Sequence, residues 1–184
     1  MDLSAAVYDP LSLTQIIGYI AAFCGILAFL QHDDRRMKIL LVFQAAFLVA
    51  HFGFLGAYTG MFAAVLAGSR AGLSIFDGAR RRKRFLVPVY FVLTVCLGWF
   101  SYQNPVDLLP LAAAVTGVIA FFYLHGIRMR LVLSIGTCFW LAHNIMKVSY
   151  GPIVMESTML IVQSVTIWRM MRRARRISEL ADAV

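Results

Sequence analysis

The strongest constraint on this chain is a series of seven apolar runs separated by short polar segments, at about 11–30, 39–57, 61–76, 85–101, 106–124, 131–147 and 152–170. Most approach the roughly 17–25 residues that a helix needs to cross a bilayer. Apolar residues make up 61% of the 184 positions and charged residues only 14%, too few to cover a soluble domain. Because backbone groups in lipid must hydrogen-bond within their own segment, the sequence predicts an all-α membrane protein with seven transmembrane helices in a single domain, 1–184.

The basic residues predict how these helices are oriented. If the seven runs are spans, 15 of the 17 Lys and Arg residues fall on one side of the membrane. They are Arg35, Arg36, Lys38, Arg80, Arg81, Arg82, Lys83, Arg84, Arg128, Arg130, Arg169, Arg172, Arg173, Arg175 and Arg176. Basic loops stay in the cytoplasm, so we expect a periplasmic N-terminus and a cytoplasmic C-terminal tail, 171–184. The formal net charge of +8 then reflects orientation and contact with the lipid bilayer, and we expect no nucleic-acid partner.

The chain also resembles itself at a constant spacing of 92 residues. Aligning each residue between 18 and 58 with the residue 92 positions later gives 12 identities without a gap. They include Arg36/Arg128, Met37/Met129, His51/His143 and Tyr58/Tyr150. A single helix between two three-helix copies makes both copies cross the membrane in the same direction. The sequence therefore predicts a 3+1+3 arrangement of two parallel triple-helix repeats, at about 11–76 and 106–170, joined by a connector helix at about 85–101.

Several stretches resemble a known family. The segments "DDRRMK", "AHFGFLGAYTG", "NPVDLLP", "RMRLVLSIGTCFWLAHN" and "IWRMMRR" look like the YgjV family of bacterial inner membrane proteins, to about residue 173. That family is similar in layout to the SWEET and PQ-loop transporters. The resemblance implies the SWEET-like fold and a multi-pass location in the inner membrane, and it names no substrate. Neither repeat has a Pro-Gln dipeptide in its first helix, where only Pro110 stands, and Ala67 and Gln163 stand where such families tend to carry asparagine.

The two histidines of the repeat are the first candidates for function. His51 and His143 each lie 12 residues after the start of an apolar run, roughly 18 Å into the membrane. If the repeats are symmetric, both should face a shared interface. Histidine titrates near neutral pH, so the pair could relay protons or bind a polar solute. The alternative is that each imidazole only hydrogen-bonds a neighbouring helix.

Two charges lie within apolar runs. Arg70 is in the third run and Glu156 is in the seventh, each at least four residues from the ends of its run. A charge at such depth is costly and needs a partner or water. The two residues could form a structural ion pair that fixes the bundle, or Arg70 could hold an anionic solute; the sequence leaves both open.

Four further polar or aromatic residues could line a solute site: Trp140, Asn144, Gln163 and Ser69. Core packing and hydrogen bonding between helices are the commoner uses of such residues in membranes. Cys24, Cys96 and Cys138 show no metal-ligand spacing, so we expect neither a metal nor another cofactor.

The sequence supports two functional hypotheses. The first is a small-solute transporter or facilitator that binds a small polar or anionic solute between the repeats. The second is a membrane receptor or interaction protein that binds its ligand without moving it. No nucleophile, acid-base or metal pattern indicates an enzyme, and the sequence leaves a homo-oligomer open.

Overall fold

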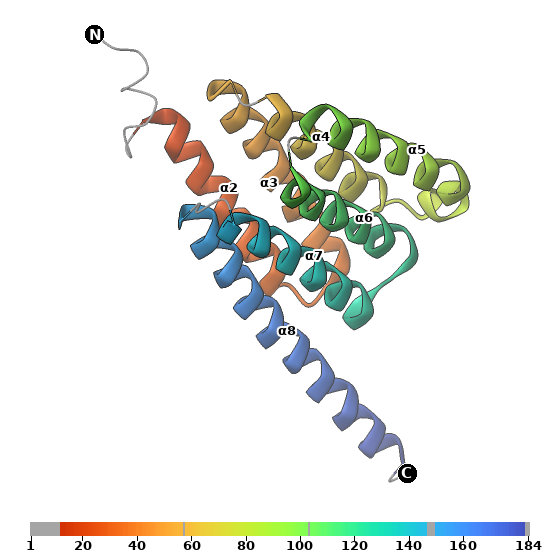
Figure 1. Ribbon diagram of the computed structural model, residues 1–184. Coiled ribbons are helices and arrows are strands. Elements are labelled where there is room, and N and C mark those ends of the chain that lie inside the picture. Colours follow the sequence, from red (N-terminus) through yellow and green to blue (C-terminus); the bar gives the residue numbers. More distant parts are fainter. Residues whose placement is uncertain (1–11, 57, 103, 147–149, 183–184) are drawn as a thin grey trace.

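The computed structural model describes residues 12–56, 58–102, 104–146 and 150–182, and these form only helices. The elements are α2 (Leu13–Leu30), α3 (Asp34–Phe54), α4 (Tyr58–Leu73), α5 (Asp77–Ser101), the short 3-10 helix η1 (Pro105–Asp107), α6 (Leu108–Tyr123), α7 (Gly126–Met146) and α8 (Tyr150–Asp182). Successive α-helices alternate in direction, so α2 and α6 run the same way (Figure 1). The all-helical prediction with seven long helices is confirmed for the described residues.

Local sequence signals set the helix ends. The Ser12 hydroxyl accepts from the Gln15 backbone N–H, and the Asp33 carboxylate accepts from the Arg36 N–H at 2.7 Å, so both side chains cap helix N-termini. Gly126 is the first residue of α7 and has a φ of 55°, a left-handed conformation that glycine adopts without strain. These signals keep the α2–α3 and α6–α7 connections short, so each pair of helices is antiparallel and adjacent.

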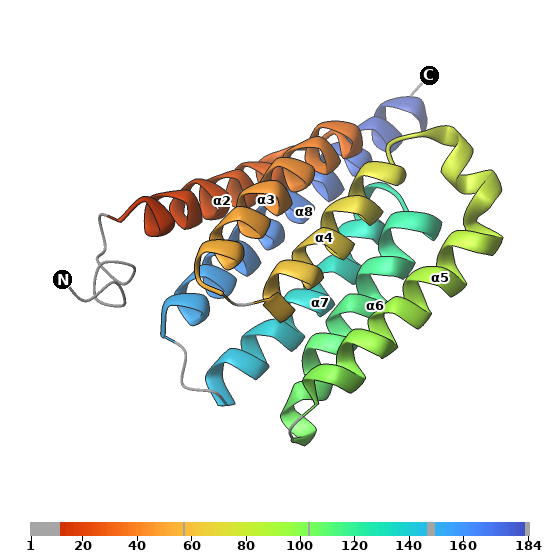
Figure 2. The ribbon, with the colours of Figure 1, turned by 90° about the horizontal axis from the view of Figure 1, so that it is seen from above.

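Six helices pack side by side in a closed ring, in the order α2, α3, α4, α6, α7 and α8 (Figure 2). Helix α3 packs between α2 and α4, and α7 packs between α6 and α8. The two groups meet where α2 contacts α8 and where α4 contacts α6, while α5 packs on α6 and α4. The central core is made of Ala28, Phe29, Met37, Ala71, Ala120, Phe121, Met129 and Met159.

Large apolar side chains cover the outside of the molecule. Trp99 and Phe100 on α5 are 82% and 88% exposed, and Val154 and Ile161 on α8 are 67% and 65% exposed. Three helical segments of the described chain are long and apolar enough to cross a membrane: Leu13–Leu30, Asp34–Phe54 and Pro105–Tyr123. Gly60–Leu73 and Arg84–Phe100 are shorter apolar helices. An apolar exterior of this kind fits contact with lipid rather than water.

Some helix bounds differ from the predicted runs. Helix α4 is shifted three residues toward the N-terminus relative to the predicted run 61–76. Helix α5 begins eight residues before the predicted run 85–101, and α8 ends twelve residues after the predicted run 152–170. The arginine-rich segments next to these runs are good helix formers, so helices α5 and α8 extend past the apolar stretches that the hydropathy pattern detects.

Two of the identical residue pairs 92 positions apart have matching burial. Ala28 and Ala120 are both fully buried, as are Met37 and Met129. Each pair places one residue in the first three helices and one in the last three.

Candidate functional site

Two cavities meet inside the bundle. The first, which we call the α8-side cavity, has a volume of about 410 Å³ and is lined by residues of α2, α3, α4, α6, α7 and α8. The second, the α5-side cavity, has a volume of about 300 Å³ and is lined by α4, α5, η1, α6 and α7. Five residues line both: Gly60, Ala63, Ala67, Arg70 and Trp140. Both volumes lie in the range of small-molecule sites.

Arg70 lies at the junction of the two cavities. Its Nη1 donates to the Ala114 carbonyl of α6 at 3.0 Å, and its Cζ lies 5.7 Å from the centre of the Phe121 ring. Its Nε is buried, with no hydrogen-bond partner among the described residues. Gly117 makes room for this group, since a Cβ at that position would lie 2.6 Å from the Arg70 Cζ. Helix α6 is therefore shaped to accept a guanidinium from α4.

Glu156 lines the α8-side cavity together with Arg70. The side chain is 9% exposed. The described residues contain no ion pair between Glu156 and Arg70, and no hydrogen bond reaches the Glu156 carboxylate within that part of the chain. The structural ion pair that the sequence left open is therefore not formed, and both charges face the same cavity.

The two histidines do not share an interface. The His51 Nδ1–H donates to the Thr14 carbonyl of α2 at 2.8 Å, and His51 packs on Gly18 and lines neither cavity. His143 lines the α5-side cavity, and its Nε2 lies 3.8 Å from an oxygen of Asp107. The expected shared interface is absent because each imidazole turns to the N-terminal end of the first helix in its own half of the chain.

Trp140, Asn144 and Ser69 have different surroundings. Trp140 lines both cavities and meets the His143 ring edge to face at 5.9 Å. Asn144 lines the α8-side cavity and is 8% exposed. Ser69 is exposed outside both cavities, where its Oγ accepts from the Tyr90 hydroxyl at 2.8 Å. The structure thus brings Trp140 and Asn144 to the cavities and uses Ser69 to join α4 to α5.

Gln163 joins α8 to α7. Its Nε2 donates to Thr137 at 3.0 Å, and its Oε1 accepts from the Ser134 hydroxyl at 2.9 Å. The side chain is 1% exposed and lines neither cavity. These contacts match the structural alternative for a polar residue in a membrane helix.

Sequence reasoning missed four polar residues that line the cavities: Gln44, Thr94, Asp107 and Thr137. A Cβ at Gly25 would lie 2.6 Å from the Gln44 Nε2, so Gly25 makes room for Gln44 as Gly117 does for Arg70. The identical pair Gly25/Gly117 was therefore the available signal: each glycine accommodates a polar side chain from a neighbouring helix.

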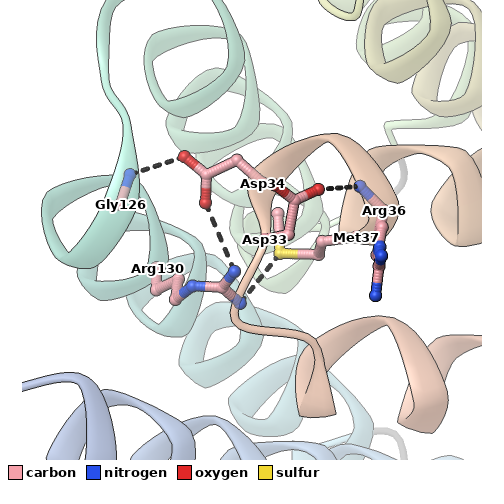
Figure 3. A network of polar contacts seen from close by, with 6 residues as sticks. All are labelled: Asp33, Asp34, Arg36, Met37, Gly126 and Arg130. Atoms are coloured by element: carbon pink, nitrogen blue, oxygen red, sulfur yellow. Dashed lines mark hydrogen bonds and ion pairs between the residues drawn. The ribbon is translucent and has the colours of Figure 1, made fainter. Parts of the chain in front are cut away.

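A polar network lies at the end of the bundle where α3 and α7 begin (Figure 3). Asp34 accepts from the Gly126 N–H at 2.6 Å and from the Arg130 Nη2 at 3.3 Å. The Arg130 Nη1 also contacts the Met37 sulfur at 3.1 Å. Arg130 is 1% exposed, although the sequence placed it in a loop. The network ties the starts of α3 and α7 together.

Comparisons with known proteins agree with these features. The model of a family described as bacterial inner membrane protein, YgjV, matches residues 12–174. The inner membrane protein YgjV of Escherichia coli (strain K12) is 32% identical over 164 residues, which cover 88% of this chain and 87% of that protein. No solved structure matches. The fold and cavities define a multi-helical membrane protein with an internal polar site. The chain belongs to the YgjV family of bacterial inner membrane proteins.

Proposed function

We propose that this protein is a small-solute transporter or facilitator of the inner membrane and not an enzyme. The solute site consists of the two cavities that meet at Arg70. The observation that carries the proposal is this junction: one partly buried cation lines both cavities, one of which is also lined by α5 and the other by α3 and α8. A charge inside a membrane helix is costly and marks a solute or ion pathway when it faces a cavity.

The packing supports a 3+1+3 arrangement of two parallel repeats. Helix α2 contacts α8, and its counterpart α6 contacts α4, so the first helix of each proposed repeat packs on the third helix of the other. The matched burial of Ala28 with Ala120 and of Met37 with Met129 agrees with this relation. Rocking of one repeat against the other would open the site to each side in turn. By the positive-inside rule the N-terminus is periplasmic and the C-terminus cytoplasmic.

The test is the accessibility of residue 67 from the two sides of the membrane. Ala67 lines both cavities, so Ala67→Cys in a chain without Cys24, Cys96 and Cys138 places one thiol at the junction. We expect a membrane-impermeant maleimide to label it both in spheroplasts and in inside-out vesicles. Val92→Cys, on an exposed apolar face of α5, is the matched control and should resist labelling from both sides.

The same labelling separates the transporter from a receptor of the same fold. A receptor binds from one side and keeps the other side closed by packed side chains in every state. Labelling of Ala67→Cys from one side alone, with or without metabolites, would therefore contradict transport and favour a receptor or interaction protein.

A further inference from the structure

Two opposite charges face one cavity without meeting each other. Arg70 and Glu156 both line the α8-side cavity, and neither forms an ion pair among the described residues. From this juxtaposition we infer that the solute is zwitterionic, with a carboxylate held by Arg70 and an ammonium group held by Glu156, as in a free α-amino acid. The inference rests on the proposed function, because it names the class of solute for that site.

The Arg70 guanidinium has donors to spare. Nη1 is engaged with the Ala114 carbonyl, which fixes the direction of the group. No hydrogen bond within the described chain uses the Nη2 donors, and Arg70 makes no ion pair there. A guanidinium with an open edge is well suited to a carboxylate, since charge-assisted hydrogen bonds to that group are short and directional.

The Glu156 carboxylate is an acceptor without a donor. It is buried, and none of the described side chains or backbone N–H groups reaches it. An ammonium group carries three donors and one positive charge, so it would satisfy this carboxylate in both respects. Asn144 and Gln44 line the same cavity and offer neutral hydrogen bonds next to the two charges.

The positions of the two charged residues along their helices suit one small molecule. Arg70 lies 12 residues into α4 and Glu156 six residues into α8, and the two helices begin at the same end of the bundle. The difference of six residues corresponds to an offset of about 9 Å between the two Cα positions along the helix axes. A carboxylate and an ammonium a few bonds apart, with a hydrogen bond of about 2.8 Å at each end, span a similar length.

The remaining lining predicts what the solute carries between its charges. Apolar and aromatic side chains surround the cavity: Phe29, Leu41, Leu48, Phe52, Phe121, Met155 and Met159. An amino acid with an apolar side chain would bury that group against them. A solute with only a negative charge would leave Glu156 uncompensated, and one with only a positive charge would leave Arg70 uncompensated, so a molecule with both charges fits best.

The experiment compares matched ligands on the purified full chain in detergent. The probes are the 20 standard amino acids, followed by the N-acetyl and amide derivatives of those that raise the melting temperature. N-acetylation removes the positive charge and amidation removes the negative one, with the side chain unchanged. We expect at least one apolar amino acid to stabilise the protein and both of its derivatives to lose at least about tenfold in affinity.

Charge-removing variants provide the second arm. Arg70→Gln and Glu156→Gln should each weaken binding of that amino acid by at least about tenfold, because each removes one charge-assisted contact. Arg175→Gln and Glu179→Gln make the same chemical changes on the exposed end of α8 and should leave affinity unchanged. The derivative comparison needs only the wild-type protein, so it decides the question even if a variant fails to fold.

Three outcomes would overturn the inference. They are no stabilisation by any amino acid at millimolar concentration, equal binding of an N-acetyl or amide derivative, and stabilisation by glycerophosphoethanolamine alone, which would assign the site to a lipid headgroup. Uptake into proteoliposomes tests the proposed function separately. Binding of an amino acid without uptake would contradict transport but support a zwitterionic ligand. Uptake of a singly charged solute would support transport but contradict a zwitterionic solute.

Discussion

Asp34→Asn should destabilise the protein because it strands the buried Arg130. The asparagine side chain would still accept from the Gly126 N–H, so the change removes the charge while keeping an acceptor in place. Arg130 is 1% exposed, and Asp34 is the only carboxylate within ion-pair distance of it among the described residues. Its other contact is the Met37 sulfur, a weak acceptor.

The size of the loss follows from these contacts. Removing one partner of a buried ion pair costs about 3–5 kcal/mol. Asp34 is 26% exposed, so water offsets part of that cost. A hydrogen bond to a charged group contributes about 1.5–3 kcal/mol. We therefore expect Asp34→Asn to lower the free energy of unfolding by about 2–3 kcal/mol.

A double-mutant cycle tests the reasoning. Replacing both partners, in Asp34→Asn with Arg130→Met, leaves no stranded charge, so the double variant should lose less than about 1.5 kcal/mol relative to wild type. Unfolding in mixed micelles, followed by tryptophan fluorescence, measures each free energy. A loss below about 0.5 kcal/mol for Asp34→Asn, or additive losses in the double variant, would show that the pair does not hold α3 and α7 together.

Three further predictions concern packing, pH and topology. Gly68→Ala should lower the free energy of unfolding by about 1–3 kcal/mol, because the new Cβ would lie 2.7 Å from the Ala45 Cβ. Gly72→Ala is the control and should not be destabilising, because its Cβ would lie 3.5 Å from Val42. Equal effects of the two variants would contradict the close α3–α4 contact. Burial and the positive charges of Arg173, Arg130 and Arg169 lower the pKa of His32 below 6.5, so the unfolded chain protonates first as the pH falls. Stability should therefore decline as the pH drops through 6.5, and His32→Gln should make that decline smaller in thermal unfolding. If His32→Gln leaves the pH profile unchanged, the decline comes from other groups. Tyr102→Cys should be labelled from the periplasm and Arg82→Cys from the cytoplasm, and the reverse pattern would overturn the orientation.

Composition and periodicity predicted most of the helices because a bilayer imposes length and backbone pairing on every spanning segment. The same rules say little about how far a helix continues into water, which is why the start of α5 and the end of α8 were missed. Arg70 and Glu156 were found because a charge in an apolar run is conspicuous in the sequence.

Pairing between side chains was harder to predict. Whether Arg70 meets Glu156 depends on which helices adjoin and at what angle, and hydropathy does not contain that information. His51 and His143 are equivalent in sequence, yet only His143 lines a cavity, since Thr14 offers a backbone carbonyl to one ring and Asp107 a carboxylate to the other. The Asp34–Arg130 contact joins positions 96 residues apart and required the three-dimensional packing of α3 against α7.

Helix α8 is longer than the hydrocarbon core of a bilayer is thick, so a tilt at one end of the helix moves the other end through a larger distance. Its 33 residues span about 50 Å, while the hydrocarbon core of a bilayer is only about 30 Å thick. Trp168 and Arg172, stacked at 4.8 Å, lie in the C-terminal half of α8. The C-terminal end of this helix extends beyond the bundle (Figure 1). Because Glu156 lies near the other end of this continuous helix, a tilt of about 10° at the cavity would displace the far tip by roughly 7 Å. A probe attached at residue 175 would therefore report, from the water, a movement that begins inside the membrane.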